Sequence, residues 1–162
     1  MNIVLLEPEI PANTGNIGRT CVATGSALHL IEPLGFVLDE KHVRRAGMDY
    51  WYELELYRYV DFDDFLSKNK DARLIFASTK GTFCYSDFSF NANDFIVFGK
   101  ESAGIPEEIL KQNPETTIRI PMIGETRSLN LSNSVAIVLY EALRQTGFEG
   151  LKMQGELHRL KW

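Results

Sequence analysis

The chain has 162 residues, of which 44% are hydrophobic and 24% charged, which suits one globular domain with a single sizeable core. No apolar run approaches the roughly 20 residues that a membrane-spanning helix needs, and residues 1–7 are typical of a strand rather than of a signal peptide, so we expect a cytoplasmic protein with no membrane partner. The formal net charge of −5 weighs mildly against a nucleic-acid partner.

Short apolar runs alternate with helix-like segments along the chain. The expected strands are Ile3–Leu6, Leu28–Ile31, an extended piece over 54–60, Leu74–Ala77, Phe95–Phe98 and Ile118–Ile120. The expected helices are 13–24 with Asn13 or Thr14 as its cap and Gly25 as its stop, 39–46, Asp61 to about Asn69, Pro106 to about Gln112, and Ser132–Thr146 before Gly147.

This alternation predicts βαβ units, and therefore an α/β fold with a mostly parallel sheet covered by helices on both faces. We find no repeat, no low-complexity stretch and no linker. Residues 150–162 have weak periodicity and are expected to form a peripheral tail. Residues 1–162 are therefore expected to form a single domain.

The first segment with chemical character, Pro11–Thr20, follows the first strand. Gly15 and Gly18 are only three positions apart, so the dinucleotide-binding fingerprint is absent, and no Gly-Lys-Ser/Thr follows that would indicate a phosphate-binding P-loop. The segment is a polar turn entering a helix that carries Arg19 near its start. A capped helix with an exposed arginine explains it equally well.

The second segment, Phe95–Pro106, runs from a buried strand through Gly99 and a loop to a proline-started helix. Ligands in open α/β sheets bind beyond the carboxyl ends of the strands. Gly99 would let a ligand approach the backbone, and Glu101 could accept hydrogen bonds from that ligand. The alternative is a plain connection that uses glycine for its turn.

The third segment, 118–141, places a dense polar cluster before an apolar helix. One Ser or Asn suffices to cap a helix, so a ligand or a subunit interface would explain the surplus polar groups. The cluster consists of Arg127, Ser128, Asn130, Ser132, Asn133 and Ser134.

Basic residues gather in two places on this acidic chain, and such local patches can bind phosphates because salt screens distant charges. A solvated helix face would explain them equally well. Cys21 and Cys84 are isolated and are expected to be free thiols, and the three histidines lack metal-ligand spacing, so no metal is expected. The basic groups are Lys41, His42, Arg44 and Arg45, and in the tail Lys152, His158, Arg159 and Lys161.

In this order, the three segments resemble the signature motifs of the SPOUT (SpoU–TrmD) class of RNA methyltransferases. Further matches resemble its single-domain tRNA (cytidine/uridine wobble) 2′-O-methyltransferases, and the likeness covers about residues 2–149. The matching residues are Phe98-Gly-Lys-Glu-Ser-Ala-Gly-Ile-Pro106, Ile120-Pro-Met122, Ser128-Leu-Asn-Leu-Ser-Asn133, Leu6-Glu-Pro-Glu-Ile-Pro11, His29-Leu-Ile-Glu-Pro33, Arg44-Arg-Ala-Gly-Met-Asp-Tyr50 and Phe76-Ala-Ser-Thr-Lys-Gly81.

The resemblance implies a C-terminal deep trefoil knot, a homodimer, and transfer of a methyl group from S-adenosyl-L-methionine (AdoMet) to the ribose 2′-hydroxyl of the wobble nucleotide in a tRNA anticodon loop. It also implies that Arg19 lies beside the methyl donor of the other subunit, with Tyr140 as a second catalytic candidate. Tyr140 could equally be a core aromatic of the long helix. By matched position the cofactor-binding residues are Ala77, Ser78, Gly99, Glu101, Ile120, Met122, Ser128 and Leu129.

The RNA-contacting residues implied by the resemblance are Asn13, Arg44, Arg45 and Asn130, of which the arginines would bind phosphates. Some family members have Thr-Arg where this chain has Ser102-Ala103, so the resemblance does not imply a phosphate contact by an arginine of that loop.

Three alternatives stay open. They are a nicotinamide- or nucleotide-binding enzyme, a catalytically silent RNA-binding relative, and a methyltransferase of the same class acting on another tRNA or rRNA nucleotide.

Overall fold

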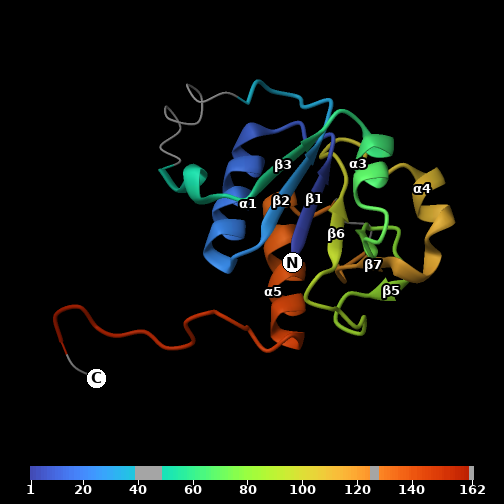
Figure 1. The fold of residues 1–162 in the computed structure, drawn as a ribbon. Helices are drawn as coiled ribbons and strands as arrows, with labels where there is room; N and C mark the ends of the chain where they lie inside the picture. Colours follow the sequence, from blue (N-terminus) through green and yellow to red (C-terminus); the bar gives the residue numbers. More distant parts are fainter. Residues whose placement is uncertain (39–48, 125–127, 161–162) are drawn as a thin grey trace.

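The computed structural model describes residues 1–38, 49–124 and 128–160 (Figure 1). Within these residues seven strands form one sheet of order β3-β2-β1-β6-β4-β7-β5, and every neighbouring pair is parallel. The strands are β1 (Asn2–Leu6), β2 (Ala27–Ile31), β3 (Leu56–Tyr59), β4 (Leu74–Ala77), β5 (Phe83–Cys84), β6 (Phe95–Phe98) and β7 (Thr117–Arg119).

The helices connect these strands and end close to the expected positions. The α-helices of the described residues are α1 (Pro11–Thr24), α3 (Phe62–Lys68), α4 (Glu107–Gln112) and α5 (Leu131–Gln145), and the short 3-10 turns are η1 (Asp49–Glu53) and η2 (Pro114–Thr116). The parallel α/β architecture predicted from the alternating pattern is confirmed. The helix expected over 39–46 lies outside the described residues.

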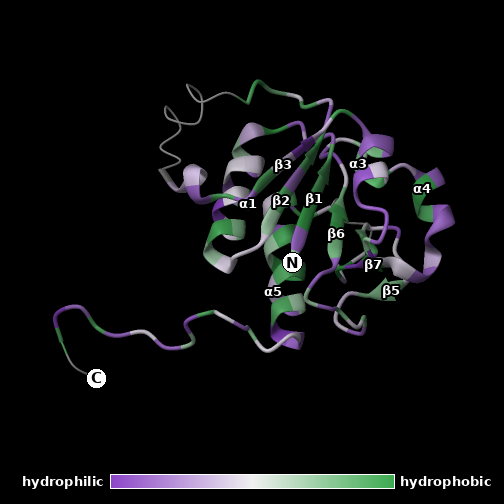
Figure 2. Cartoon of the chain, in the orientation of Figure 1, coloured by the Kyte–Doolittle hydropathy of each residue, from purple (hydrophilic) through white to green (hydrophobic). Residues whose placement is uncertain are grey.

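Alternate residues of the central strands enter different cores, because helices cover both faces of the sheet. Ile3 and Leu5 of β1 pack with residues of α1 and α5, such as Ile17 and Leu139. Val4 and Leu6 pack in a second core, which includes Phe65 of α3 and Leu110 of α4. Figure 2 shows the central strands as hydrophobic along most of their length, as expected for strands buried on both faces.

Helix α1 begins earlier than expected and has a different cap. We predicted Asn13 or Thr14 at the N-cap, but Ile10 occupies this position and makes no side-chain capping bond. The helix can begin at Pro11 because proline fits the first turn, where an N–H is not needed. The stop at Gly25, with a left-handed φ of 63°, is confirmed.

The end of the described chain runs away from the globular body after α5 (Figure 1). Residues 152–160 are exposed and contain no helix or strand. Leu151 still packs against the core shared by α1 and α5. Among the helices of the described residues, none is both long and apolar enough to cross a membrane.

Candidate active site

A cavity of about 590 Å³ opens at the carboxyl-terminal edge of the sheet. Its walls come from the chain just after β4, β6 and β7 and from the starts of α1 and α5. The neighbouring strands β6, β4 and β7 are parallel, so their carboxyl ends all lie next to the cavity. This is where open α/β sheets bind ligands.

All eight residues expected at the cofactor site line this one cavity, although they come from three separate segments. Asn13 and Asn130 line it as well, whereas Arg19 and Tyr140 do not. Arg44 and Arg45 lie outside the described residues. The eight are Ala77, Ser78, Gly99, Glu101, Ile120, Met122, Ser128 and Leu129.

The loop after β6 is folded so tightly that a side chain at Gly99 has no space. A Cβ built on Gly99 would lie 2.1 Å from the carbonyl carbon of Gly104. Lys100 and Gly104 form an antiparallel bridge across this loop, and Gly104 has a φ of 71°. The two glycines therefore shape the loop that forms one wall of the cavity.

Glu101 connects this loop to helix α1. Its carboxylate accepts hydrogen bonds from the Glu9 amide at 2.8 Å, the Ile10 amide at 3.3 Å and the Asn13 side-chain amide at 2.8 Å. A carboxylate here also lies at the positive end of the helix dipole. Glu101 lines the cavity, but both of its oxygens are engaged with the start of α1.

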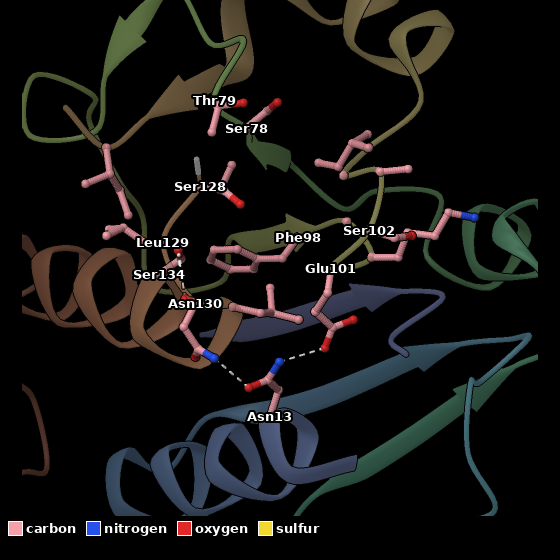
Figure 3. Close-up of a pocket in the computed structure, with 18 of the residues that line it drawn as sticks. Asn13, Ser78, Thr79, Phe98, Glu101, Ser102, Ser128, Leu129, Asn130 and Ser134 are labelled. Carbon is pink, nitrogen blue, oxygen red and sulfur yellow. Dashed lines mark hydrogen bonds between the residues drawn. The ribbon is translucent and has the colours of Figure 1, made fainter. Parts of the chain in front are cut away.

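Asn13 carries the same network on to helix α5, as Figure 3 shows. Its side-chain oxygen accepts a bond from the Asn130 amide at 2.9 Å. The Asn130 oxygen in turn caps α5 by accepting bonds from the amides of Ser132 and Asn133. Part of the surplus polar cluster is thus explained within the chain, since Asn130 caps the helix and also binds Asn13.

Two further contacts fasten the loop after β1 to the loop after β6. Lys100 forms an ion pair with Glu7 at 2.7 Å, and this contact raises the pKa of Lys100. Glu9 accepts bonds from the hydroxyl and the amide of Ser102, both at 2.8 Å, which together lower the pKa of Glu9. Ser102 therefore has a structural partner.

The charged side chains that line the cavity among the described residues already have protein partners. Lys80 pairs with Glu107 at 2.7 Å, Lys100 with Glu7, and Glu101 with α1. The remaining lining combines backbone, hydroxyl and apolar groups. Such a surface suits a ligand that is recognised through backbone contacts and shape.

Sequence reasoning missed several residues of the cavity wall that lie in segments it had already singled out. Thr79 and Lys80 belong to the Phe76–Gly81 match, and Ser134 belongs to the polar cluster of the third segment. Phe98 ends a predicted strand, and its ring also lines the cavity (Figure 3). The signal for these residues was their position at or just after the carboxyl end of a strand, or in the first turn of a helix.

Arg19 and Tyr140 lie on the outer surfaces of two helices that pack together, α1 and α5. The Arg19 guanidinium carbon lies 4.9 Å from the centre of the Tyr50 ring. Tyr140 is 47% exposed, so its interpretation as a core aromatic is wrong. Ile137, one turn earlier on α5, is 36% exposed.

Both cysteines are free thiols, as predicted, and neither lines the cavity. Burial raises the pKa of Cys21 to about 12, which keeps this thiol protonated and unreactive. Within the described residues, no group of three or more His, Cys, Asp or Glu side chains could hold a metal ion.

Residues 1–140 match the SpoU rRNA Methylase family. The chain belongs to this family. A curated relative in Escherichia coli, named tRNA (cytidine(34)-2′-O)-methyltransferase, is 50% identical to this SpoU methylase over 151 residues, which cover 93% of this chain and 96% of the relative. The resemblance drawn from the three segments is thereby confirmed.

Solved structures agree with this assignment. A structure described as giving insights into the 2-OH methylation of C/U34 on tRNA is 44% identical to this SpoU methylase, with a TM-score of 0.84 over 90% of this chain and 95% of that one. The SpoU methyltransferase AviRb from Streptomyces viridochromogenes, solved with AdoMet, is 26% identical with a TM-score of 0.78 over 90% of this chain and 60% of that one.

Proposed function

We propose that this SpoU methylase transfers a methyl group from AdoMet to the ribose 2′-oxygen of the wobble nucleotide, position 34, in a tRNA anticodon loop. The observation that carries the proposal is the cavity itself, in which three distant motif segments meet at the carboxyl ends of parallel strands. The 50% identity to the Escherichia coli enzyme, over nearly the whole of both chains, supports the nucleotide specificity. A cytoplasmic location follows from a tRNA substrate.

The cavity fits AdoMet in size and in chemistry. Its volume of about 590 Å³ lies within the usual range for sites of small ligands. Ala77, Leu129 and Ile120 supply apolar surface, while Ser78 and Ser128 supply hydroxyl groups. The tight loop at Gly99 leaves backbone groups close to any bound molecule. When bound, AdoMet supplies an electrophilic methyl group on a sulfonium, which is a good leaving group.

The protein must therefore mainly align the ribose hydroxyl with the methyl group and help the hydroxyl lose its proton, and alignment alone can be worth about 7–11 kcal/mol. A guanidinium has a pKa above about 12 and is effectively never deprotonated in proteins, so Arg19 is a poor general base. We assign it instead the orientation of the 2′-hydroxyl and its neighbouring phosphate, and the stabilisation of developing negative charge. Water or a phosphate oxygen takes the proton.

A homodimer is part of the proposal, with Arg19 of the partner subunit completing each site. Arg19 is exposed and does not line the cavity of its own chain. Ile137 and Tyr140 expose apolar surface on α5, which packs beside α1. A symmetric pairing through α1 and α5 would cover this surface and bring the arginine to the other cavity. Tyr140 would then lie near the substrate.

The RNA would be held by Arg44 and Arg45, whose positions lie outside the described residues, and by Asn13 and Asn130, which line the cavity. A single-stranded anticodon loop suits such a surface, because splayed bases can be read individually. The deep trefoil knot also belongs to this proposal. It is supported by the meeting of the loops after β4, β6 and β7 at one cavity.

The deciding experiment is a methylation assay with labelled AdoMet and undermodified tRNA, followed by alkaline hydrolysis. A methylated 2′-oxygen cannot attack its neighbouring phosphate, so an alkali-resistant dinucleotide containing position 34 is expected. Label at a different nucleotide would support a relative with another RNA target. Binding of tRNA without any methyl transfer would instead support the catalytically silent alternative.

Replacing Arg19 by lysine tests the assigned role of the arginine. The charge is kept but the bidentate geometry is lost, so kcat should fall by about 10²-fold or more. The affinity for S-adenosyl-homocysteine (AdoHcy), measured by calorimetry, should stay unchanged. Arg58→Lys, at another exposed arginine, is the matched control and should keep full activity. Full activity of Arg19→Lys would refute the assignment.

A further inference from the structure

The short turn η1 packs directly against helix α1 through the two glycines of the first motif segment. A Cβ built on Gly18 would lie 2.9 Å from Cζ3 of Trp51, so the indole leaves no room for a side chain there. The hydroxyl of Tyr50 donates a hydrogen bond to the Gly15 carbonyl at 2.7 Å. The glycine spacing that does not fit a dinucleotide site is thus explained by the docking of an aromatic turn.

This docking places an aromatic ring beside the arginine proposed to act in methyl transfer. The Tyr50 ring centre lies 4.9 Å from the Arg19 guanidinium carbon, within the range of a cation–π contact. In an α-helix the carbonyl of one residue faces the amide of the fourth residue onward, so Gly15 and Arg19 belong to the same turn. Tyr50 therefore contacts this turn twice: its hydroxyl binds the Gly15 carbonyl, and its ring packs on the Arg19 guanidinium.

We propose that Tyr50 is a positioning residue for methyl transfer, which holds the Arg19 guanidinium in the direction needed to reach the substrate. An exposed arginine otherwise has many side-chain rotamers of similar energy. The inference rests on the proposed function of Arg19. It also gives a role to Tyr50 within the matched run 44–50, since Tyr50 is assigned neither to cofactor binding nor to phosphate binding.

The test compares Tyr50→Leu with Tyr50→Phe in single-turnover methylation of undermodified tRNA. Tyr50→Leu removes the ring, so the methyl-transfer rate should fall by about tenfold to a hundredfold, as expected when a reacting group is displaced by about 1 Å. Tyr50→Phe keeps the ring and should stay within about fivefold of wild type, the equivalent of one neutral hydrogen bond. The AdoHcy affinity should be unchanged in both variants.

Tyr57→Leu is the matched control for lost stability. Tyr57 stacks on the buried His29 ring at a centroid distance of 4.8 Å and is itself 43% exposed. It lies on the same face of β3 as Tyr59, whose core contains no residue of α1. This variant should lower the melting temperature without lowering the methyl-transfer rate. An equal loss of rate in Tyr57→Leu and Tyr50→Leu would show that destabilisation alone explains the effect, and would overturn the proposal.

A double-mutant cycle with Arg19→Lys distinguishes positioning of Arg19 from an independent effect. Because Tyr50 acts through the guanidinium, Tyr50→Leu should cause little further loss in the Arg19→Lys background. The inference would be refuted if the double variant lost rate by the product of the two single losses, or if Tyr50→Leu were fully active, provided that the wild type methylates tRNA. A wild-type protein that methylates no RNA would refute the proposed function instead.

Discussion

At the scale of single residues, the buried His29 makes stability depend on pH. It is 3% exposed, and its two ring nitrogens meet the Tyr59 hydroxyl at 2.9 Å and the Asn2 side-chain oxygen at 3.2 Å. Desolvation lowers its pKa to about 4, against about 6.5 in an unfolded chain. The unfolded state therefore binds the proton more readily, and acid favours unfolding.

His29 should stabilise the fold fully above pH 6.5 and lose this contribution as the pH falls toward 4. Between pH 6.5 and 5 the free energy of unfolding should fall by about 2 kcal/mol, measured by urea denaturation. His29→Gln should remove most of this slope. His158→Gln, at an exposed tail position, should keep the wild-type slope. An unchanged slope in His29→Gln would contradict the prediction.

At the scale of elements, the start of helix α1 is held by a carboxylate from a distant loop. Ile10 supplies no side-chain cap, and the Glu101 carboxylate instead binds the Glu9 and Ile10 amides and the Asn13 side chain. Glu101→Gln should reduce the free energy of unfolding by about 1–2 kcal/mol, because it removes a charged acceptor at a helix start.

The matched control for this change is Glu107→Gln in the first turn of α4. Glu107 belongs to an exposed ion pair with Lys80, and its side chain is 73% exposed. Solvent screens such exposed pairs, so Glu107→Gln should have only a small effect in the same urea titrations. If Glu101→Gln is no less stable than Glu107→Gln, the carboxylate does not stabilise the start of α1.

Several strands and one helix cap could be predicted from the sequence, whereas contacts between distant segments could not. Leu74–Ala77 and Phe95–Phe98 were predicted residue for residue, because short apolar runs between turn signals are characteristic of buried parallel strands. The Asp61 cap of α3 was also predicted, since its partner Asp64 is only three residues away. The contact of Glu101 with the start of α1 was not predicted, because Glu101 lies 91 residues from Ile10 and only the folded sheet brings them together.

Other features were missed for related reasons. Strand β5 has only two residues, Phe83 and Cys84, so it has no periodicity to detect. The packing of Tyr50 on Arg19 joins two motif segments that were each interpreted alone. The position of every cofactor-site residue at one cavity could be expected only through the family resemblance, since composition and spacing lead no further than an α/β ligand-binding domain.

At the scale of the whole molecule, the cavity and Arg19 are separate parts of one chain. The cavity lies at the carboxyl edge of the sheet, whereas Arg19 is exposed on α1 outside the cavity lining. If each site combines a cavity from one subunit with Arg19 of the partner subunit, two variants that are inactive alone should complement each other.

The two variants are Arg19→Ala and Ala77→Phe, where the phenyl ring fills the cavity and should abolish AdoHcy binding in calorimetry. After co-expression in equal amounts, half of the dimers should be mixed, and each mixed dimer should contain one complete site. The mixture should then recover about a quarter of the wild-type methylation rate. The control pairs a chain that carries both substitutions with a wild-type chain, and its mixed dimer is isolated with two different affinity tags because wild-type homodimers are active. In this mixed dimer the wild-type cavity meets Arg19→Ala and the wild-type Arg19 meets the Ala77→Phe cavity, so neither site is complete. Activity in that mixed dimer, with none in the complementing pair, would show that each subunit uses its own Arg19.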